Sequence, residues 1–316
     1  MTNDRIAQRC ICCASTELDR SSAILMPFVA KRVFGHEPVE ITEEWGLRDL
    51  QCGMAYTLCA SLQCQQCGVL FLDYRFSDQE MTQLYHGYRD ERYNRERQYY
   101  EPGYGAASSY YQGRADYIAD VEGWLESRLP KSPSVLDWGG GTGVNTLFRG
   151  LSKFTHIYDI SSVATVEGIQ AVSLEETRKH HYDLVICSQV LEHVPYPHEL
   201  LKQIAGSLGD ETLLYLEVPN EVLIRENPGN KKLAPLKRHW HEHVNFFTEQ
   251  SLRELVNYAG LQVQEIINLN VDLGGRTGNL VGVIARCIPQ AGGMKSITDC
   301  LNKKAGVPLS LSGVRA

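Results

Sequence analysis

The sequence has no long apolar run, no excess of basic charge and no internal repeat. Its longest apolar stretch, near Ala23 to Ala30, is interrupted by Pro27 and is too short to cross a bilayer. The first residues, MTNDRIAQRC, contain no apolar signal region, so we expect a cytoplasmic protein without membrane insertion. A net charge of −7 argues against a general nucleic-acid binder, which would carry a basic face, and favours a small-molecule substrate. Without a heptad run, the sequence does not predict an oligomeric state.

Cysteine, by contrast, is abundant and unevenly placed, because seven of the ten cysteines precede residue 70. Without a signal peptide, they are better interpreted as thiols or metal ligands than as disulfides. Two C-x-x-C pairs stand out, Cys10 with Cys13 and Cys64 with Cys67. Each pair can hold one edge of a zinc ion from a tight turn, so together they predict a tetrahedral zinc site. Further candidates by position are Cys12, Cys52 and Cys59.

The role expected for this zinc is structural. A closed four-cysteine site leaves no coordination position for a substrate, so we expect the ion to stabilise the N-terminal segment. An RNA-binding zinc ribbon is the alternative interpretation. The middle of the segment carries Glu37, Glu40, Glu43 and Glu44, and this acidic stretch disfavours a nucleic-acid partner.

A glycine-rich stretch, SVLDWGGGTG from Ser134 to Gly143, predicts a buried strand that turns sharply into a helix. Gly139, Gly141 and Gly143 lack Cβ, so the backbone can take positive φ and a ligand can approach its amides. Asp137, at the strand end, can accept hydrogen bonds. The D-x-G-x-G-x-G spacing differs from the G-x-G-x-x-G of dinucleotide folds, which leaves an NAD-dependent oxidoreductase as the rival enzyme class.

Strand and helix signals alternate after this loop, which favours an α/β fold with a doubly wound sheet. The further expected strands are 154–160, 169–172, 181–188, 211–219, 262–267 and 280–286. Asp159 ends the second strand, where an acid in nucleoside-binding folds accepts from both ribose hydroxyls. We expect Ile160 beside it to line the same site. Ser173 and Leu174, after the third strand, are expected near an adenine.

Three of these features together resemble the class I S-adenosylmethionine (SAM) methyltransferases: residues 135–143, Asp159, and YDLVICSQVLEHVPYP at 182–197. The resemblance covers about half of the chain. It implies a seven-stranded Rossmann-like sheet with the last strand antiparallel, and a SAM site across the ends of the first, second and fourth strands. The SAM-binding residues that we expect are Asp137, Gly139, Gly141, Gly143, Asp159, Ile160, Ser173, Leu174 and Gln189.

A four-cysteine segment ahead of such a domain, with an H-E-H element after the fifth strand, is similar to the nucleotide-sugar C-methyltransferases of keto-deoxysugars. That resemblance implies roles around the sugar for Glu242, His243, His193 and Tyr88. Trp240 departs from the family, which usually has tyrosine there. The alternative is an O-methyltransferase acting on a surface-polysaccharide sugar or another small molecule, since a hydroxyl needs less acidification than a carbon.

Methyl transfer from a sulfonium requires a base, because the methyl group is already activated and the acceptor must lose a proton. Histidine titrates near neutrality. His239, His241 and His243 alternate in HWHEHVNFF, so in an extended segment they share one face, and Glu242 points away from His243. We favour His243 as the base and His241 next. A metal held by this cluster is the alternative, and for His193 the alternative is a loop histidine satisfied by backbone.

Residues 78–129 are polar and rich in tyrosine and arginine, which predicts a surface that grips a polar ligand. A helix is expected over 106–129, closed by Pro130 and packed on the catalytic domain. At 316 residues, with 43% hydrophobic residues, the chain is long enough for about two domains. We expect a zinc-binding domain at 1–75, a tyrosine-rich substrate cover at 76–130, a methyltransferase domain at 131–288 and a tail at 289–316.

Overall fold

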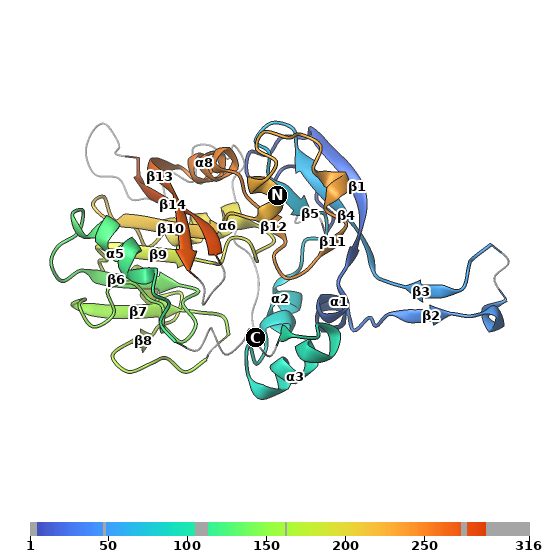
Figure 1. The fold of residues 1–316 in the computed structure, drawn as a ribbon. Helices are drawn as coiled ribbons and strands as arrows, with labels where there is room; N and C mark the ends of the chain where they lie inside the picture. The colour runs from blue at the N-terminus through green and yellow to red at the C-terminus, as the bar shows by residue number, and fades with distance from the viewer. Residues whose placement is uncertain (1–4, 47–48, 105–112, 162, 273–276, 289–316) are drawn as a thin grey trace, which may run out of the picture.

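The computed structural model describes residues 5–46, 49–104, 113–161, 163–272 and 277–288. The predicted tail, 289–316, and Tyr110 and Tyr111 of the predicted cover lie outside the described residues. Figure 1 shows two lobes, with a seven-stranded sheet on the left and a five-stranded sheet at the upper right. Among the described residues, every helix is too short or too polar to pass through a bilayer. The cytoplasmic location stays a prediction.

The larger sheet has the strand order β13-β14-β10-β9-β6-β7-β8. Its strands are β6 (Ser134–Trp138), β7 (Phe154–Tyr158), β8 (Gln170–Ala171), β9 (Leu184–Ser188), β10 (Leu213–Pro219), β13 (Leu261–Asp272) and β14 (Thr277–Cys287). The five neighbouring strands β10, β9, β6, β7 and β8 run parallel to one another. Strand β14 is antiparallel to both of its neighbours, β10 and β13. The predicted Rossmann-like methyltransferase sheet is therefore confirmed, with β13 and β14 longer than expected.

Helices cover both faces of this sheet. On one face, α5 (Ile118–Glu126) buries Ile118, Val121 and Leu125 against β6, β9, β10 and β14. On the other face, α6 (Pro197–Ala205) and α8 (Glu249–Tyr258) join a core with alternate residues of the same strands. Because side chains alternate along a strand, each central strand supplies both cores. The expected packing of α5 on the catalytic sheet is confirmed, although the described helix is shorter than 106–129.

The helix expected after the glycine-rich loop is absent, and that prediction is wrong. Residues 139–151 form successive turns in its place. Gly143 has φ +81°, Phe148 has φ +57° and Gly150 has φ +81°, so left-handed residues recur before a helix can complete its first turns. Any ligand here therefore meets loop amides and not the N-terminus of a helix.

The smaller sheet has the order β11-β1-β4-β5-β12. Its strands are β1 (Leu18–Leu25), β4 (Leu58–Cys64), β5 (Leu70–Leu72), β11 (His239–Trp240) and β12 (Asn245–Phe246). Residues 239–246, which follow β10 in the chain, thus complete the sheet of the N-terminal lobe. The indole of Trp240 is buried there and donates from Nε1 to Ser61 Oγ at 2.8 Å. The segment that carries the H-E-H element therefore joins the two lobes.

Helices α1 (Pro27–Phe34), α2 (Asp78–Tyr85) and α3 (Glu91–Tyr100) lie below this sheet in Figure 1. Their buried residues pack with residues of the sheet in one hydrophobic core. Strands β2 (Val39–Ile41) and β3 (Gly53–Ala55) form a hairpin that projects away from the lobe. The remaining elements are α7 (Val222–Arg225) and the 3₁₀ turns Glu43–Trp45, Glu176–Arg178 and Ala234–Leu236. The predicted domain boundaries stay predictions.

Candidate functional site

The glycine-rich loop follows β6 at the carboxyl edge of the sheet. A Cβ at Gly139 would lie 2.6 Å from a methyl of Val190, and one at Gly143 would lie 2.5 Å from Ile169, so both glycines permit close packing. Gly141 differs, because its φ is +57° and a Cβ there would meet nothing within 4 Å. Gly141 therefore marks the open side of the loop, where a ligand can approach the backbone.

The two predicted acids of the SAM site flank this loop. Asp159 accepts from the amide of Gly141 at Oδ2, 2.8 Å away, and from the amide of Ser161 at Oδ1, 2.7 Å away. The structure thus brings Asp159 and Gly141 together. Asp137 is buried, and burial raises the pKa of its carboxyl to about 7 although the hydroxyl of Thr146 donates to it at 2.5 Å.

Gln189 lies at the end of β9 in a strained conformation, with φ +56°. Its backbone amide donates to the carbonyl of Glu217 at 2.9 Å, and its side-chain amide donates to the carboxylate of Glu217 at 3.1 Å. Glu217 is buried and also accepts from Ser188 at 2.6 Å and Tyr215 at 2.7 Å. Sequence reasoning missed this carboxylate, although its place near the end of the buried strand β10 was a usable signal.

The other predicted SAM residues are placed less centrally. Ile160 directly follows Asp159 and is 58% exposed. Ser173 donates from its amide and hydroxyl to Glu176, both at 2.8 Å, and so begins the short 3₁₀ turn after β8. Leu174 packs partly against the main core. Among the described contacts, none joins Ser173 or Leu174 to the glycine-rich loop.

His243 is held by a carboxylate that the sequence analysis did not identify. Its Nδ1 lies 2.7 Å from Glu221 Oε1, and Glu221 comes two residues after β10. Burial lowers the pKa of His243, but the hydrogen bond that its Nδ1 donates to Glu221 and the negative charges of Glu192 and Glu221 outweigh burial and raise the pKa above the ordinary histidine value. The imidazole of His193 faces His243 edge-on, with ring centres 4.7 Å apart.

Nδ1 of His193 has a side-chain partner and a backbone partner. It lies 2.8 Å from Tyr85 Oη and 3.2 Å from the carbonyl oxygen of Glu242. Burial lowers the pKa of His193 well below its ordinary value, so the ring is neutral. Its Nε2 lies 3.6 Å from a carboxylate oxygen of Glu192. The Glu192 carboxyl is buried without a hydrogen-bond partner, and burial raises its pKa to about 8.

The alternating histidines do not converge as an extended segment predicts. The ring of His241 lies 5.4 Å from that of His239, whereas His243 turns to His193. Potential metal-ligand atoms of Glu192, His193 and His243 lie within 4.8 Å of one another, which is the spacing of a metal site. The three alternating histidines do not form such a group.

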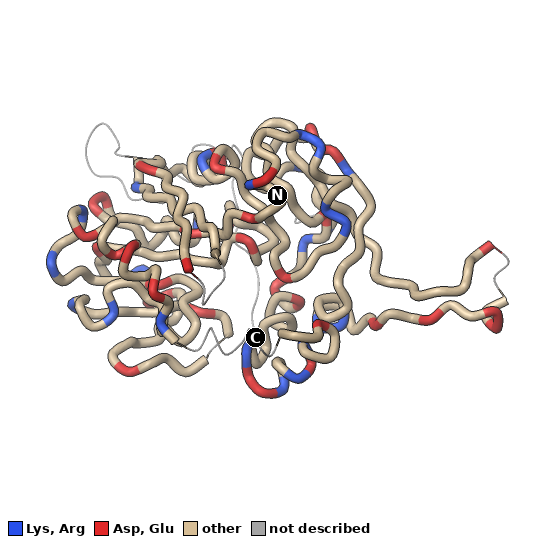
Figure 2. Tube along the Cα trace, in the orientation of Figure 1, with Lys and Arg blue, Asp and Glu red and all other residues tan. Residues whose placement is uncertain are grey.

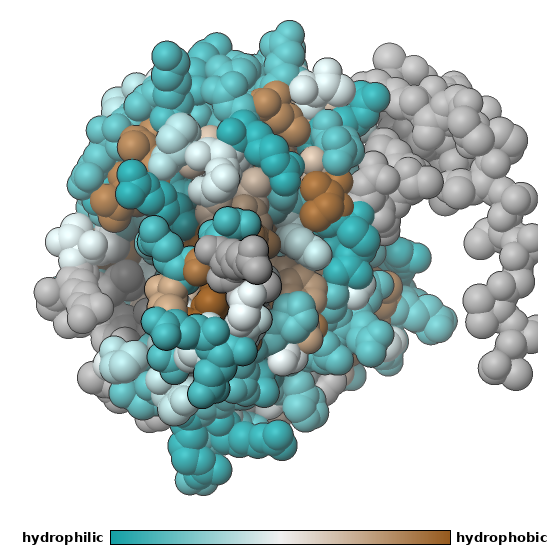
Figure 3. All heavy atoms as spheres, turned by 90° about the vertical axis from the view of Figure 1, so that its right-hand side faces the viewer, coloured by the Kyte–Doolittle hydropathy of each residue, from teal (hydrophilic) through white to brown (hydrophobic). Residues whose placement is uncertain are grey.

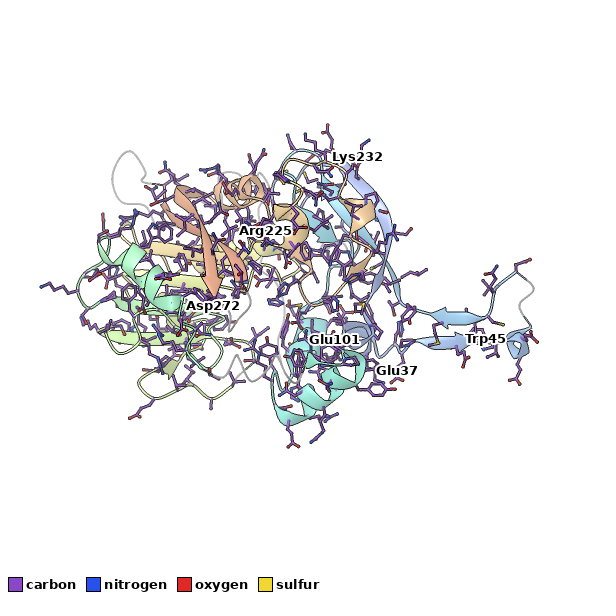
Figure 4. The ribbon with its side chains drawn as sticks, viewed as in Figure 1. Glu37, Trp45, Glu101, Arg225, Lys232 and Asp272 are labelled. Carbon is purple, nitrogen blue, oxygen red and sulfur yellow. The ribbon has the colours of Figure 1, made fainter. Side chains whose placement is uncertain are left out.

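Glu242 and His241 belong to a chain of charges at the end of α3. Arg97 donates to Glu242 at 2.7 Å and to Glu101 at 2.9 Å, and His241 Nδ1 lies 3.2 Å from the other oxygen of Glu101. Figure 4 labels Glu101 at the helices below the five-stranded sheet. Glu242 therefore does not contact His243, in agreement with the expectation that it points away.

The tyrosine that contacts His193 is Tyr85 and not Tyr88. Tyr88 packs edge-on against Tyr85 and Tyr93, with ring centres 5.5 and 5.3 Å apart, and burial raises its pKa to about 12. The tyrosine-rich helices thus lie against the loop that carries the histidines. This contact is consistent with the expected cover over a polar substrate.

The four predicted zinc ligands come together. Cys10 Sγ lies 3.5 Å from Cys67 Sγ, Cys13 Sγ lies 3.6 Å from Cys64 Sγ, and all four sulfurs lie within 4.8 Å of one another. Tetrahedral zinc with Zn–S bonds of about 2.3 Å separates its sulfurs by about 3.8 Å. A disulfide needs about 2.05 Å, so this arrangement fits a metal and not a pair of disulfides. Cys12 is buried and is not one of these four residues.

Known proteins are similar to part of this chain. Residues 111–266 match a family model described as "Methyltransferase domain". A ubiquinone biosynthesis O-methyltransferase of Nitrosospira multiformis is 28% identical over 106 residues, which is 32% of this chain and 44% of the relative. Its namesake in Nitrosomonas europaea is 23% identical over 176 residues, 49% of this chain and 73% of the relative. The chain thus spans less than half of the first relative.

Among solved structures, 1,6-didemethyltoxoflavin-N1-methyltransferase of Burkholderia thailandensis, determined with bound 1,6-didemethyltoxoflavin and S-adenosylhomocysteine, is similar over 59% of this chain and 89% of its own. The TM-score is 0.43 and the sequence identity is 18%.

Proposed function

We propose that this protein, whose residues 111–266 match a methyltransferase domain, uses SAM to methylate a carbon of a nucleotide-linked keto-deoxysugar. The proposal combines the site geometry with the resemblance of the four-cysteine segment and the H-E-H element to sugar C-methyltransferases. A nucleotide-activated sugar is polar, and the tyrosine-rich helices supply hydroxyl and aromatic groups of the kind that grip such a ligand.

The observation that carries the proposal is the pair of His243 with Glu221, opposite the neutral ring of His193. A sugar carbon becomes acidic only beside a ketone, so its methylation needs a base and a group that stabilises the enolate. Nε2 of His243 takes the carbon-bound proton while Glu221 holds Nδ1. Nδ1 of His193 faces both the Tyr85 hydroxyl and the carbonyl of Glu242. In the tautomer in which Tyr85 donates to Nδ1, Nε2 of that ring carries the proton and would donate it to the enolate oxygen.

SAM supplies an activated methyl group on a sulfonium when it is bound. That methyl group would pass to the enolate carbon, and His243 would hold the proton taken from the same carbon. For the cofactor seat we propose Asp159 at the ribose hydroxyls, with Gly141 leaving room for the ligand and Gln189 presented beside it by Glu217.

We also propose that Cys10, Cys13, Cys64 and Cys67 hold a structural zinc ion. The amides of Cys12 and Cys13 point at the sulfur of Cys10, 3.4 and 3.5 Å away, as donors to a thiolate ligand do. Thr248, which begins α8, donates to the carbonyl of Cys67 at 2.9 Å. The site would therefore brace the N-terminal lobe against the methyltransferase domain.

An O-methyltransferase is the second candidate function, and the curated relatives favour it, because they are named ubiquinone biosynthesis O-methyltransferases. A hydroxyl acceptor would use the same base without needing a neighbouring ketone.

Proton exchange separates the two candidates. We expect wild-type protein, incubated with a keto-deoxysugar nucleotide in deuterated water without SAM, to replace the proton next to the ketone by deuterium, which NMR follows as loss of that signal. The His243→Ala variant should not exchange it above the buffer rate. If wild-type protein methylates the same sugar nucleotide but does not replace this proton by deuterium, the O-methyltransferase is favoured.

A further inference from the structure

Glu192 carries a buried carboxyl that no other group satisfies. Its side chain is 1% exposed, and neither carboxylate oxygen has a hydrogen-bond partner among the described residues. Proteins rarely bury a polar group in this way, and one that they do bury points to a function or to a bound water or ion. Because two histidines lie beside this carboxyl, a cation is the ligand that would satisfy it best.

The two imidazoles bring their nitrogens to the same place. Nε2 of His193 lies 3.6 Å from Glu192 Oε1, and the ring centres of His193 and His243 are 4.7 Å apart. One potential ligand atom from each of the three residues lies within 4.8 Å of the other two. Tetrahedral zinc, with bonds to nitrogen and oxygen of about 2.0–2.1 Å, separates its ligand atoms by roughly 3.3 Å. The separation of His193 and Glu192 therefore needs little adjustment to hold an ion.

The second nitrogen of each ring is already engaged. Nδ1 of His243 lies 2.7 Å from Glu221 Oε1. Nδ1 of His193 lies 2.8 Å from Tyr85 Oη and 3.2 Å from the carbonyl oxygen of Glu242. In the tautomer with the proton on Nδ1, each ring donates to one of these oxygens and presents the lone pair of Nε2. Metal-binding histidines almost always donate their other nitrogen in this way, which fixes the orientation of the ring.

Backbone hydrogen bonds join the two segments that carry the three residues. The carbonyl of Glu192 accepts from the amide of Val244 at 2.7 Å and from that of Asn245 at 3.1 Å. The buried side-chain amide of Asn245 donates to the carbonyls of Leu191 and Val194, at 2.9 and 2.7 Å. The loop after β9 and the segment before β12 are therefore held together on both sides of the ligand atoms.

The three residues are enclosed but can be reached by an ion. Figure 3 shows a largely hydrophilic outer face of the N-terminal lobe, whereas the side chains of Glu192 and His193 lie below the surface. The side chain of His243 is 35% exposed, which leaves a path from solvent. Figure 2 shows acids on both lobes, and the net charge of −7 favours the approach of cations.

We propose that Glu192, His193 and His243 form a binding site for a divalent transition-metal ion such as zinc. Two imidazoles and one carboxylate are ligands that such ions prefer, and three protein ligands leave one coordination position open. The binding is independent of the proposed reaction. Its consequence rests on that reaction: the ion occupies the lone pair that His243 needs as a base, so bound zinc inhibits methyl transfer.

Cobalt(II), a coloured substitute for zinc, tests the site in the full chain without SAM or sugar. Cobalt bound to nitrogen and oxygen gives weak visible bands, whereas cobalt bound to thiolates absorbs intensely in the near ultraviolet, which separates this site from the cysteine cluster. We expect about one equivalent of cobalt with nitrogen–oxygen bands. Glu192→Gln should weaken this binding more than about a hundredfold, and Glu221→Gln about 10- to 100-fold, the range for a group behind a metal ligand.

His241→Ala is the matched control, because it removes a neighbouring histidine whose ring faces His239, and its cobalt affinity should equal that of wild type. Circular dichroism checks that each variant is folded. His243→Ala, at the most exposed of the three ligands, gives a second test if Glu192→Gln does not fold. Wild-type protein without nitrogen–oxygen bands, or unchanged affinity in both folded ligand variants, would overturn the proposal. Loss of binding in His241→Ala would do the same.

Zinc inhibition provides the functional measurement. Zinc at a concentration that saturates the site should stop the exchange of the sugar proton for deuterium by wild-type protein. Exchange that continues at saturating zinc would contradict the proposed set of ligands. If cobalt binds as expected but wild-type protein shows no exchange even without zinc, the proposed reaction fails and the metal site stands.

Discussion

Replacing His243 by alanine is expected to lower kcat by about 10²- to 10⁴-fold, the usual range for loss of a positioned general base. The reason is that Nε2 of His243 is the basic nitrogen left free when Glu221 holds Nδ1. Affinity for SAM should change little, because no described contact joins His243 to the glycine-rich loop. Steady-state kinetics with calorimetry of SAM binding measures both. His241→Ala, at a histidine paired with Glu101, is the matched control and should stay within about tenfold of wild type.

The pH profile separates a base from a merely structural histidine. The raised pKa of His243 means that activity should fall as the pH drops through a value above the ordinary histidine pKa, since the base is then protonated. Glu221→Gln keeps a hydrogen-bond partner but removes its negative charge. The pKa of His243 should then fall, and the acidic limb should move to lower pH. An unchanged profile in Glu221→Gln, or full turnover in His243→Ala, would place the base elsewhere.

Loss of the zinc site is expected to have the largest effect on stability. Structural zinc contributes about 10–16 kcal/mol of apparent binding free energy in zinc-finger peptides. Metal analysis should find about one zinc per wild-type chain and almost none in Cys10→Ser/Cys13→Ser. The variant should lose the fold of the N-terminal lobe. Unfolding should also reach α8, because the core around the cysteines includes residues of that helix.

Cys52→Ser is the matched control for the zinc variant, because Cys52 is exposed next to β3 and lies outside the cluster. It should keep its metal and its melting temperature. Wild-type protein that is fully folded without metal would contradict a structural zinc.

The parts of the fold that the sequence predicts are those with local signals. Strands β6, β7, β9 and β10 are short apolar runs bounded by turn residues, and each lies where its run predicts. The two C-x-x-C pairs come together because ligand spacing is itself a local signal. The helix predicted after the loop does not form, and the helix propensities of its residues give no sign that Phe148 adopts a left-handed backbone conformation.

The candidate site was harder to predict, because its partners come from distant elements. Glu221 meets His243 only because residues 239–246 cross to the sheet of the N-terminal lobe. That crossing leaves no trace in local periodicity, so the sequence does not predict Glu221 as the carboxylate that contacts His243. Likewise, the burial of Glu192 depends on packing around the loop after β9, and not on the E-H-V pattern itself.

The position of the transferred methyl group tests the account most directly. Wild-type protein is incubated with SAM carrying a ¹³C-labelled methyl group and a panel of keto- and hydroxy-sugar nucleotides, and the products are examined by ¹³C NMR. The account predicts label in a keto-sugar product only, at the chemical shift of a methyl bonded to carbon and coupled to the ring carbon beside the ketone. A labelled methyl bonded to oxygen would contradict it.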